Sequence, residues 1–180
     1  MEEMAAEDQA RFEAVLGSLR RGDFSLLEPV FTRSASEAPD VLRWHGQGRF
    51  ESHPKELAEA LTCACFLGAV DVAEHLLARG VDPAGGDGTG LNAFHWASNR
   101  GQLAAVRLLL RHGAPLEVRN AFGGTVLGGA VWAAVHESKP AHLGIIEELL
   151  RARANVAEAQ YPTGLPDLDA LLRRYGAPGG

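Results

Sequence analysis

Two groups of side chains have the residue types that catalysis or metal binding requires. Cys63 and His95 could supply a thiol and the base that activates it, as in nucleophilic catalysis. His136, Glu137 and His142 could supply metal ligands. His142 follows His136 by six positions, however, whereas two imidazoles on one face of a helix are about four positions apart. We therefore interpret this segment as a solvent-exposed polar loop, and we keep a metal- or cysteine-dependent enzyme as the alternative function.

Two other motifs are weaker signals for chemistry. Asp167 and Asp169 precede a short apolar helical pattern, where carboxylates favour the positive end of the helix dipole. Residues 85–88 read Gly-Gly-Asp-Gly, but they lack the lysine and the strand–loop–helix setting of a phosphate-binding loop. These residues therefore favour no catalytic function, and we expect no cofactor and no metal.

The elements that position these side chains are clearest in residues 92–113. Two helical patterns, 93–99 and 103–111, are separated by Gly101 and followed by Gly113. Glycine readily adopts the left-handed conformation that ends many helices. Each helix is too short to be stable alone, so the pair needs neighbouring pairs to cover its apolar side.

The same pattern recurs along the chain at a fixed interval. Gly68 and Gly101 are 33 residues apart, and so are Gly80 and Gly113. A period of this length is typical of proteins built from stacked supersecondary units. The sequence therefore predicts a repeat protein.

The phrase Asn-Ala-Phe-His-Trp-Ala at 92–97 resembles the Thr-Pro-Leu-His-x-Ala phrase of ankyrin repeats. The following Gly101 and the Leu-Leu-Leu-Arg-His-Gly-Ala run at 108–114 complete the similarity, which covers about residues 55–177. The resemblance implies an all-α ankyrin-repeat solenoid of stacked helix-turn-helix units, with short hairpin-like loops and degenerate caps at both ends. It also implies a protein–protein interaction module that performs no catalysis.

The repeat pattern divides the chain into a cap and a series of units. The predicted units are a degenerate N-terminal helical repeat or cap with a linker (1–54), two full repeats (55–87 and 88–120), a third repeat with an insertion (121–160) and a partial C-terminal cap (161–180). Within the first unit we expect helices at 2–21 and 24–31 and an irregular linker at 41–54, with Trp44 packed against the first full repeat.

The third repeat departs from the pattern in two places. Seven extra residues lie between Ala130 and Ala141, because this interval has eleven steps where Ala97 to Gly101 has four. Arg153 stands where a left-handed glycine would end the helix, which costs about 1 kcal/mol if the arginine adopts that conformation. Insertions in repeat proteins map to loops, often on a binding face.

The resemblance also assigns roles to single residues. His95 matches a histidine that stabilises the turn between neighbouring repeats. Trp96 follows it, and the matching positions Cys63 and Gly129 are small, so we expect one indole packed in the repeat core rather than at a binding surface.

The positions that face a partner in this family predict a binding site on the concave face. They are Phe66, Leu67, Thr89, Leu91, Asn99, Arg100 and Phe122. Trp132 in the insertion joins this site, because it lies just beyond the helix core. Exposed aromatic side chains beside an arginine are typical of an interface centre. An alternative remains open, in which Phe66 and Leu67 pack on residues 41–54 and Trp132 packs on the C-terminal tail.

Composition and charge limit the partner and the cellular location. Among 180 residues, 46% are hydrophobic and 22% charged, and the net charge of −6 disfavours nucleic acid and anionic membranes. Cys63 and Cys65 are poorly placed to bridge each other, and the acidic residues 1–4 do not resemble a secretory signal. We expect a cytoplasmic protein that is a monomer when free and binds another protein. Two lysines against fifteen arginines favour a bacterial source.

Overall fold

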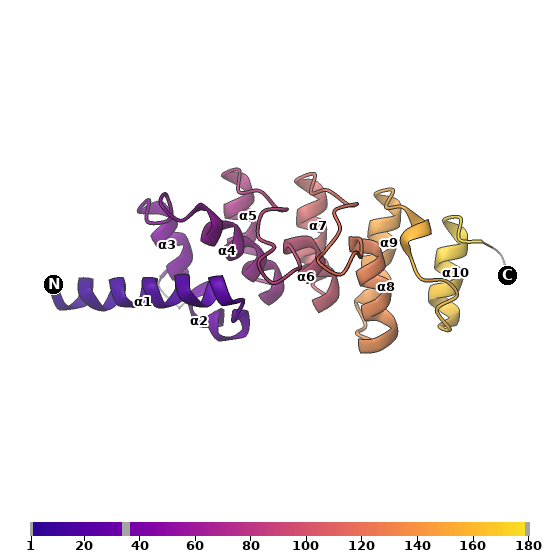
Figure 1. Ribbon diagram of the computed structural model, residues 1–180, viewed down its shortest axis with the longest axis horizontal. Helices are drawn as coiled ribbons and strands as arrows, with labels where there is room; N and C mark the ends of the chain where they lie inside the picture. The colour runs from indigo at the N-terminus through magenta and orange to yellow at the C-terminus, as the bar shows by residue number, and fades with distance from the viewer. Residues whose placement is uncertain (1, 34–36, 179–180) are drawn as a thin grey trace.

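The computed structural model describes residues 2–33 and 37–178, and every regular element in them is helical. Helix pairs follow one another along the long axis of the molecule, from the N-terminal end to the C-terminal end (Figure 1). This arrangement confirms the predicted all-α solenoid. The elements are α1 (Glu2–Arg21), η1 (Phe24–Leu27), α2 (Glu28–Phe31), α3 (Asp40–Gly46), α4 (Pro54–Leu67), α5 (Val70–Ala78), α6 (Ala93–Arg100), α7 (Leu103–Arg111), α8 (Val126–Glu137), α9 (His142–Arg151), η2 (Val156–Glu158) and α10 (Pro166–Arg174).

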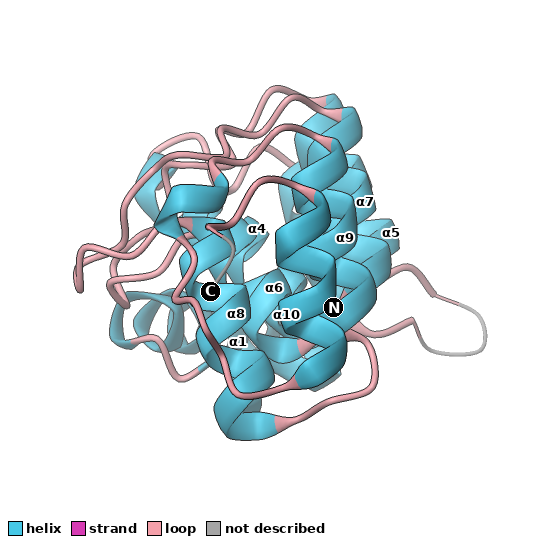
Figure 2. Ribbon diagram, turned by 90° about the vertical axis from the view of Figure 1, so that its right-hand side faces the viewer, coloured by secondary structure: helices cyan, strands magenta, loops and turns pink. Residues whose placement is uncertain are grey.

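The helices form two rows, and the loops between successive pairs gather on one side of them (Figure 2). In the first row α4 packs on α6 and α6 on α8, and in the second α5 packs on α7 and α7 on α9. The two rows share one apolar core, in which Leu61, Phe94 and Leu127 are buried at matching positions of successive repeats. Full burial of each such side chain contributes about 1.5–3 kcal/mol.

Local signals in the sequence set the ends of the short helices. At the start of α6, Asn92 Oδ1 accepts hydrogen bonds from the backbone N–H groups of Phe94 (3.0 Å) and His95 (3.1 Å). At its end Gly101 is left-handed, with φ of 77°, which allows the chain to turn directly into α7. Arg153 is also left-handed, with φ of 71°, as the repeat pattern predicts.

The N-terminal region corrects one prediction. Residues 41–54 are not an irregular linker, because α3 forms at their start and lies beside α5, while α1 lies beside α4. Pro39 precedes α3 and Asp40 stands in its first turn, both of which favour a helix start. Val41 and Trp44 are three positions apart and both are fully buried. The tryptophan packs edge-on against Phe12 of α1, with ring centroids 5.2 Å apart. Its packing against the first full repeat stays a prediction.

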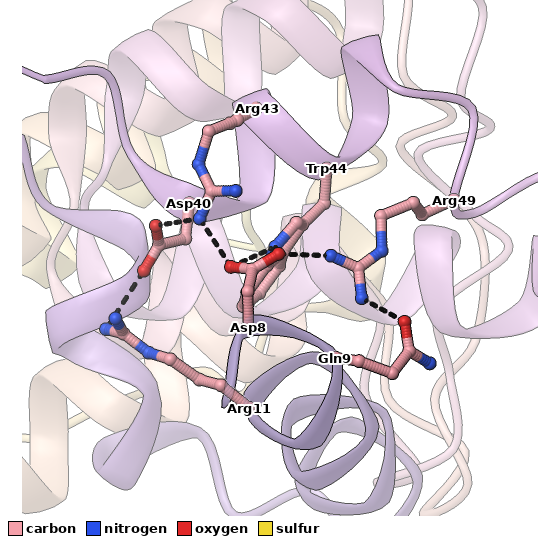
Figure 3. A network of polar contacts seen from close by, with 7 residues as sticks. All are labelled: Asp8, Gln9, Arg11, Asp40, Arg43, Trp44 and Arg49. Carbon is pink, nitrogen blue, oxygen red and sulfur yellow. Dashed lines mark hydrogen bonds and ion pairs between the residues drawn. The ribbon is translucent and has the colours of Figure 1, made fainter. Parts of the chain in front are cut away.

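A polar network joins α1 to α3 above these aromatic rings (Figure 3). The Asp8 carboxylate accepts hydrogen bonds from Arg43 (2.8 Å), Arg49 (2.5 Å) and the Trp44 indole N–H (3.1 Å). The Arg49 guanidinium also lies 4.2 Å from the centre of the Phe12 ring. These donors, the Arg43 hydrogen bond above all, lower the pKa of Asp8 to about 2.

Candidate partner-binding groove

A cavity of about 660 Å³ opens between α6, α8 and the loop that precedes α8. Five of the eight residues predicted for the binding site line it: Leu91, Asn99, Arg100, Phe122 and Trp132. Trp96, Gly128 and Gly129 also belong to the lining. We call this cavity the aromatic groove. The sequence pattern therefore brings most of the predicted site residues to one place.

Two adjacent glycines of α8 keep the groove open. A methyl group on Gly128 would lie 3.0 Å from the carbonyl oxygen of Glu158, and one on Gly129 would lie 3.2 Å from Asn99 Oδ1. Any side chain at these positions would fill space that the groove now leaves free. Thus Gly129, which the sequence analysis assigned to core packing, forms part of the groove wall instead.

Sequence reasoning placed Trp96 in the core alone, whereas the residue packs against the core and also lines the groove. Its side chain is only partly buried, lines the groove, and donates from Nε1 to Thr89 Oγ1 at 2.8 Å. The matching position in α4, Cys63, is buried because the N-terminal region covers it: its sulfur lies 3.9 Å from the carbonyl oxygen of Phe24. Trp96 is less buried than Cys63, with Phe66 lying against its ring. Thr89 therefore contributes to the groove indirectly, by orienting the indole.

Phe66 extends the aromatic surface beyond the cavity. Its ring lies edge-on to Trp96, with centroids 5.0 Å apart, and edge-on to Phe24 at 5.7 Å. The Arg100 guanidinium lies 4.6 Å from the centre of the same ring. Phe66 thus packs on η1 and α6, which excludes the alternative that it packs on residues 41–54. Leu67 is half-buried against the core and is not part of the groove lining.

The exposed side of the groove carries two large aromatic side chains. Trp132 is 51% exposed and stacks on His136 one turn later in α8, with ring centroids 4.4 Å apart. Phe122 is 83% exposed at the tip of its loop, where Asn120 Oδ1 accepts hydrogen bonds from Phe122 N (2.9 Å) and Gly124 N (3.0 Å). Leu91 differs from its prediction, since only 9% of it is exposed. The alternative for Trp132 was that it packs on the C-terminal tail, whereas the structure places it in the lining of the groove.

The extra residues of the third repeat are not the polar loop that the sequence suggested. They lengthen α8, which contains His136, and His142 lies in α9 with only 1% of its surface exposed. His142 Nε2 donates to the backbone carbonyl of Asn99 at 3.1 Å, and Lys139 Nζ lies 3.4 Å from the same oxygen. Lys139 also pairs with Glu137 at 2.5 Å, which lowers the pKa of that carboxyl. The insertion therefore supports the end of α6, next to Asn99 and Arg100 of the groove.

The residues proposed for chemistry are engaged in structure. Burial raises the pKa of the Cys63 thiol well above its usual range and that of Cys65 to about 12, which suppresses the reactive thiolate. His95 lies between Asn92 Oδ1 (2.8 Å) and the carbonyl oxygen of Gly124 in the next repeat (3.3 Å). Its predicted role in stabilising the turn between repeats agrees with these contacts.

The described part of the chain holds no cluster of three or more His, Cys, Asp or Glu side chains placed to bind one metal ion. Likewise, within residues 2–33 and 37–178, none of the helices combines the length and apolar character that crossing a membrane requires.

Comparison with known proteins agrees with this architecture. A family model described as ankyrin repeats (3 copies) matches residues 61–159, more than half of the chain. The chain belongs to the ankyrin repeat family. It is also 38% identical over 90 residues to a probable E3 ubiquitin-protein ligase from rice (Oryza sativa subsp. japonica). That match covers 47% of this chain but only 16% of the rice protein. The ankyrin repeats of this chain indicate a protein-interaction module.

Proposed function

We propose that this ankyrin repeat protein binds a partner protein through the aromatic groove on its concave face and performs no catalysis of its own. The observation that carries the proposal is the grouping of three aromatic side chains, Trp96, Phe122 and Trp132, around a space that two glycines keep open. Large aromatic residues with an adjacent arginine are the usual anchors of protein interfaces.

The exposure of these side chains supports recognition rather than folding. Most large apolar residues of the chain are buried in the shared core, whereas Phe122 and Trp132 remain in solvent. Removing apolar surface from water gains about 25 cal/mol per Å², so an exposed pair of this kind is stabilised by a partner that covers it. The groove is large enough to accept a few side chains of that partner.

The experiment for this proposal compares two exposed apolar residues. The full chain is used to isolate a binding protein from the native organism, and the purified pair is then studied by calorimetry. We expect Trp132→Ala to weaken binding at least tenfold, and Leu26→Ala, at an exposed position that is not part of the groove lining, to leave it unchanged. Equal affinity of both variants for the partner would refute the groove as the binding site.

The division into units, the monomeric state, the location and the source are further parts of the proposal, and they rest on the sequence. We propose that the chain comprises the cap at 1–54 and the units at 55–87, 88–120, 121–160 and 161–180. We also propose that it is a monomer when free and works in the cytoplasm, where its two buried free cysteines stay reduced. The bacterial source remains a prediction from the ratio of arginine to lysine.

A further inference from the structure

Two histidines face each other across the contact between α3 and α5. His45 Nδ1 lies 3.3 Å from His75 Nε2, and the ring planes are inclined by 78°. His75 Nδ1 in turn lies 2.9 Å from Nη1 of Arg79, one turn further along α5. The three side chains form a continuous chain that runs from α5 to the N-terminal region.

Elementary chemistry fixes the direction of every hydrogen bond in this chain. A guanidinium can only donate, so His75 Nδ1 must accept from Arg79 and carry no proton. The neutral His75 ring therefore has its proton on Nε2 and donates it to His45 Nδ1. His45 Nδ1 must then be an acceptor too, so its own proton lies on Nε2. Both imidazoles are neutral in this arrangement, which has no place for a further proton on either facing atom.

The groups in direct contact with the two rings, which are each other and Arg79, disfavour a positive charge on the pair. Burial and the charge of Arg79 both lower the pKa of His45, and the same causes together with His45 lower that of His75. A cavity of about 1170 Å³ beside His75 is lined by Glu7, Asp8 and Arg11 of α1, Glu37, and Arg43 of α3. The Asp8 carboxylate is already engaged by Arg43 and Arg49, and Arg11 pairs with Asp40 at 2.9 Å. Glu7 and Glu37 are the remaining carboxylates of that lining.

The contact between α3 and α5 is also loosely packed. A second cavity of about 290 Å³ lies between Pro39 and Leu42 on one side and Val70 and Val72 on the other. With open space on both flanks of α3, the histidine pair is a principal direct polar connection from α3 to α5, whereas Trp44 and the Asp8 network hold α3 to α1. The pair is thus a polar tie between α3 and α5 that does not involve α1.

We propose that His45, His75 and Arg79 form a pH-sensitive latch, which holds α3 on the first full repeat while both imidazoles are neutral and releases it when either gains a proton. A proton on His75 Nδ1 would set two donors against each other at the Arg79 contact. A proton on His45 Nδ1 would do the same at the contact between the rings. In either case the chain of hydrogen bonds from α5 to α3 is broken, and two positive charges stand close together.

The direction of the pH dependence follows from the lowered pKa values. The released state has histidines of ordinary pKa, near 6.5, and therefore binds protons more readily than the latched state as the pH falls through that value. The latch is thus fully closed above about pH 7 and weakens progressively below it. Because the pair is half-buried and not sealed from water, the change is a local one and leaves the repeats folded.

Nuclear magnetic resonance of the full chain tests the latch. At pH 7.5 the ring nitrogen shifts are expected to show His45 and His75 both neutral with the proton on Nε2. Between pH 7.5 and 5.5, the amide protection factors of α3 are expected to fall severalfold relative to those of α7, because the released histidines take up protons as the pH falls through their ordinary pKa. In His75→Gln, whose amide can both accept from Arg79 and donate to His45 without titrating, this loss should be reduced, whereas the exposed control His112→Gln should behave like the parent protein.

Arg79→Met provides a second variant that does not alter the rings. It removes the donor that fixes the His75 tautomer and the charge that opposes protonation, so the midpoint of the α3 transition should move to higher pH. A His75 ring with its proton on Nδ1 at pH 7.5, or an α3 protection that is the same at both pH values, would overturn the proposal. So would an undiminished transition in His75→Gln.

Discussion

The N-terminal region and the aromatic groove use tryptophan in opposite ways. In the N-terminal region Trp44 is fully buried, packs on Phe12 and donates its indole N–H to the Asp8 carboxylate. In the aromatic groove Trp132 leaves half of its surface in solvent, and its closest aromatic partner is the exposed His136 ring. The same side chain thus serves folding where other residues enclose it, and is available for recognition where glycines leave space in front of it.

The largest expected effect on stability comes from removing the buried tryptophan. Trp44→Ala should lower the free energy of unfolding by about 3–5 kcal/mol, because it leaves a cavity among Phe12 and Phe50 and deprives Asp8 of a donor. Urea denaturation at neutral pH measures the loss. A loss below about 1 kcal/mol would mean that the N-terminal region contributes little to the stability of the repeats.

Affinity should respond most strongly to the exposed tryptophan. Trp132→Ala should change the free energy of unfolding by no more than about 1 kcal/mol, since half of the side chain is already exposed to solvent in the free protein. Its loss should raise the Kd for the partner by a factor of about 30, corresponding to an interface anchor of about 2 kcal/mol. Comparable losses in the free energy of unfolding for Trp44→Ala and Trp132→Ala would remove the distinction between the N-terminal region and the aromatic groove.

The polar network of the N-terminal region predicts an acid-dependent stability. Asp8→Ala should cost about 1–2 kcal/mol at pH 7, because it leaves the Trp44 indole without its acceptor and leaves Arg49 with only its hydrogen bond to Gln9. In the folded protein Asp8 has a pKa of about 2, and in the unfolded chain it is protonated near its ordinary value of 3.8. The contribution of Asp8 is therefore complete above about pH 4 and declines as the pH falls towards 2.

Urea denaturation of both proteins at a series of pH values measures this contribution as a difference. The stabilities of the parent protein and of Asp8→Ala should converge near pH 2. A difference that stays constant from pH 7 to pH 2 would show that the carboxylate charge is not what holds α1 to α3.

The smallest change fills the groove with one methyl group. Gly129→Ala lies inside α8, where alanine is favoured over glycine by up to about 1 kcal/mol, and the methyl group would lie 3.2 Å from Asn99 Oδ1. We expect stability within about 1 kcal/mol of the parent and a severalfold weaker partner. Gly144→Ala is the matched control, because it has the same helix preference, lies in α9 and meets only Leu103 at 3.8 Å. Equal affinity of both alanine variants for the partner would argue against the glycine wall.

The repeats could be predicted from sequence because their signals are local. Gly68 and Gly101 mark left-handed helix ends, and Asn92 caps the helix that it precedes. These features depend on neighbours within a few positions, so a single chain is enough to read them. His95 could be placed for the same reason.

The features that sequence reasoning missed depend on distant segments. The N-terminal region covers Cys63. The Trp96 side chain stays partly exposed because the matching position in α8 is Gly129, which has no side chain. His142 is buried because its partner is the carbonyl oxygen of Asn99, more than 40 residues earlier. Helix α3 has only seven residues, so its apolar spacing is too brief to identify without the surface of α1 on which it packs.

The most direct test of the aromatic groove places a photoreactive amino acid, p-benzoylphenylalanine, at position 132 or, separately, at position 26 of the full chain. After irradiation with the purified partner, we predict a covalent adduct from position 132 and none from position 26, at protein concentrations near the Kd. Adduct formation of equal yield from both positions, or from position 26 alone, would contradict the central claim that the partner binds in the groove.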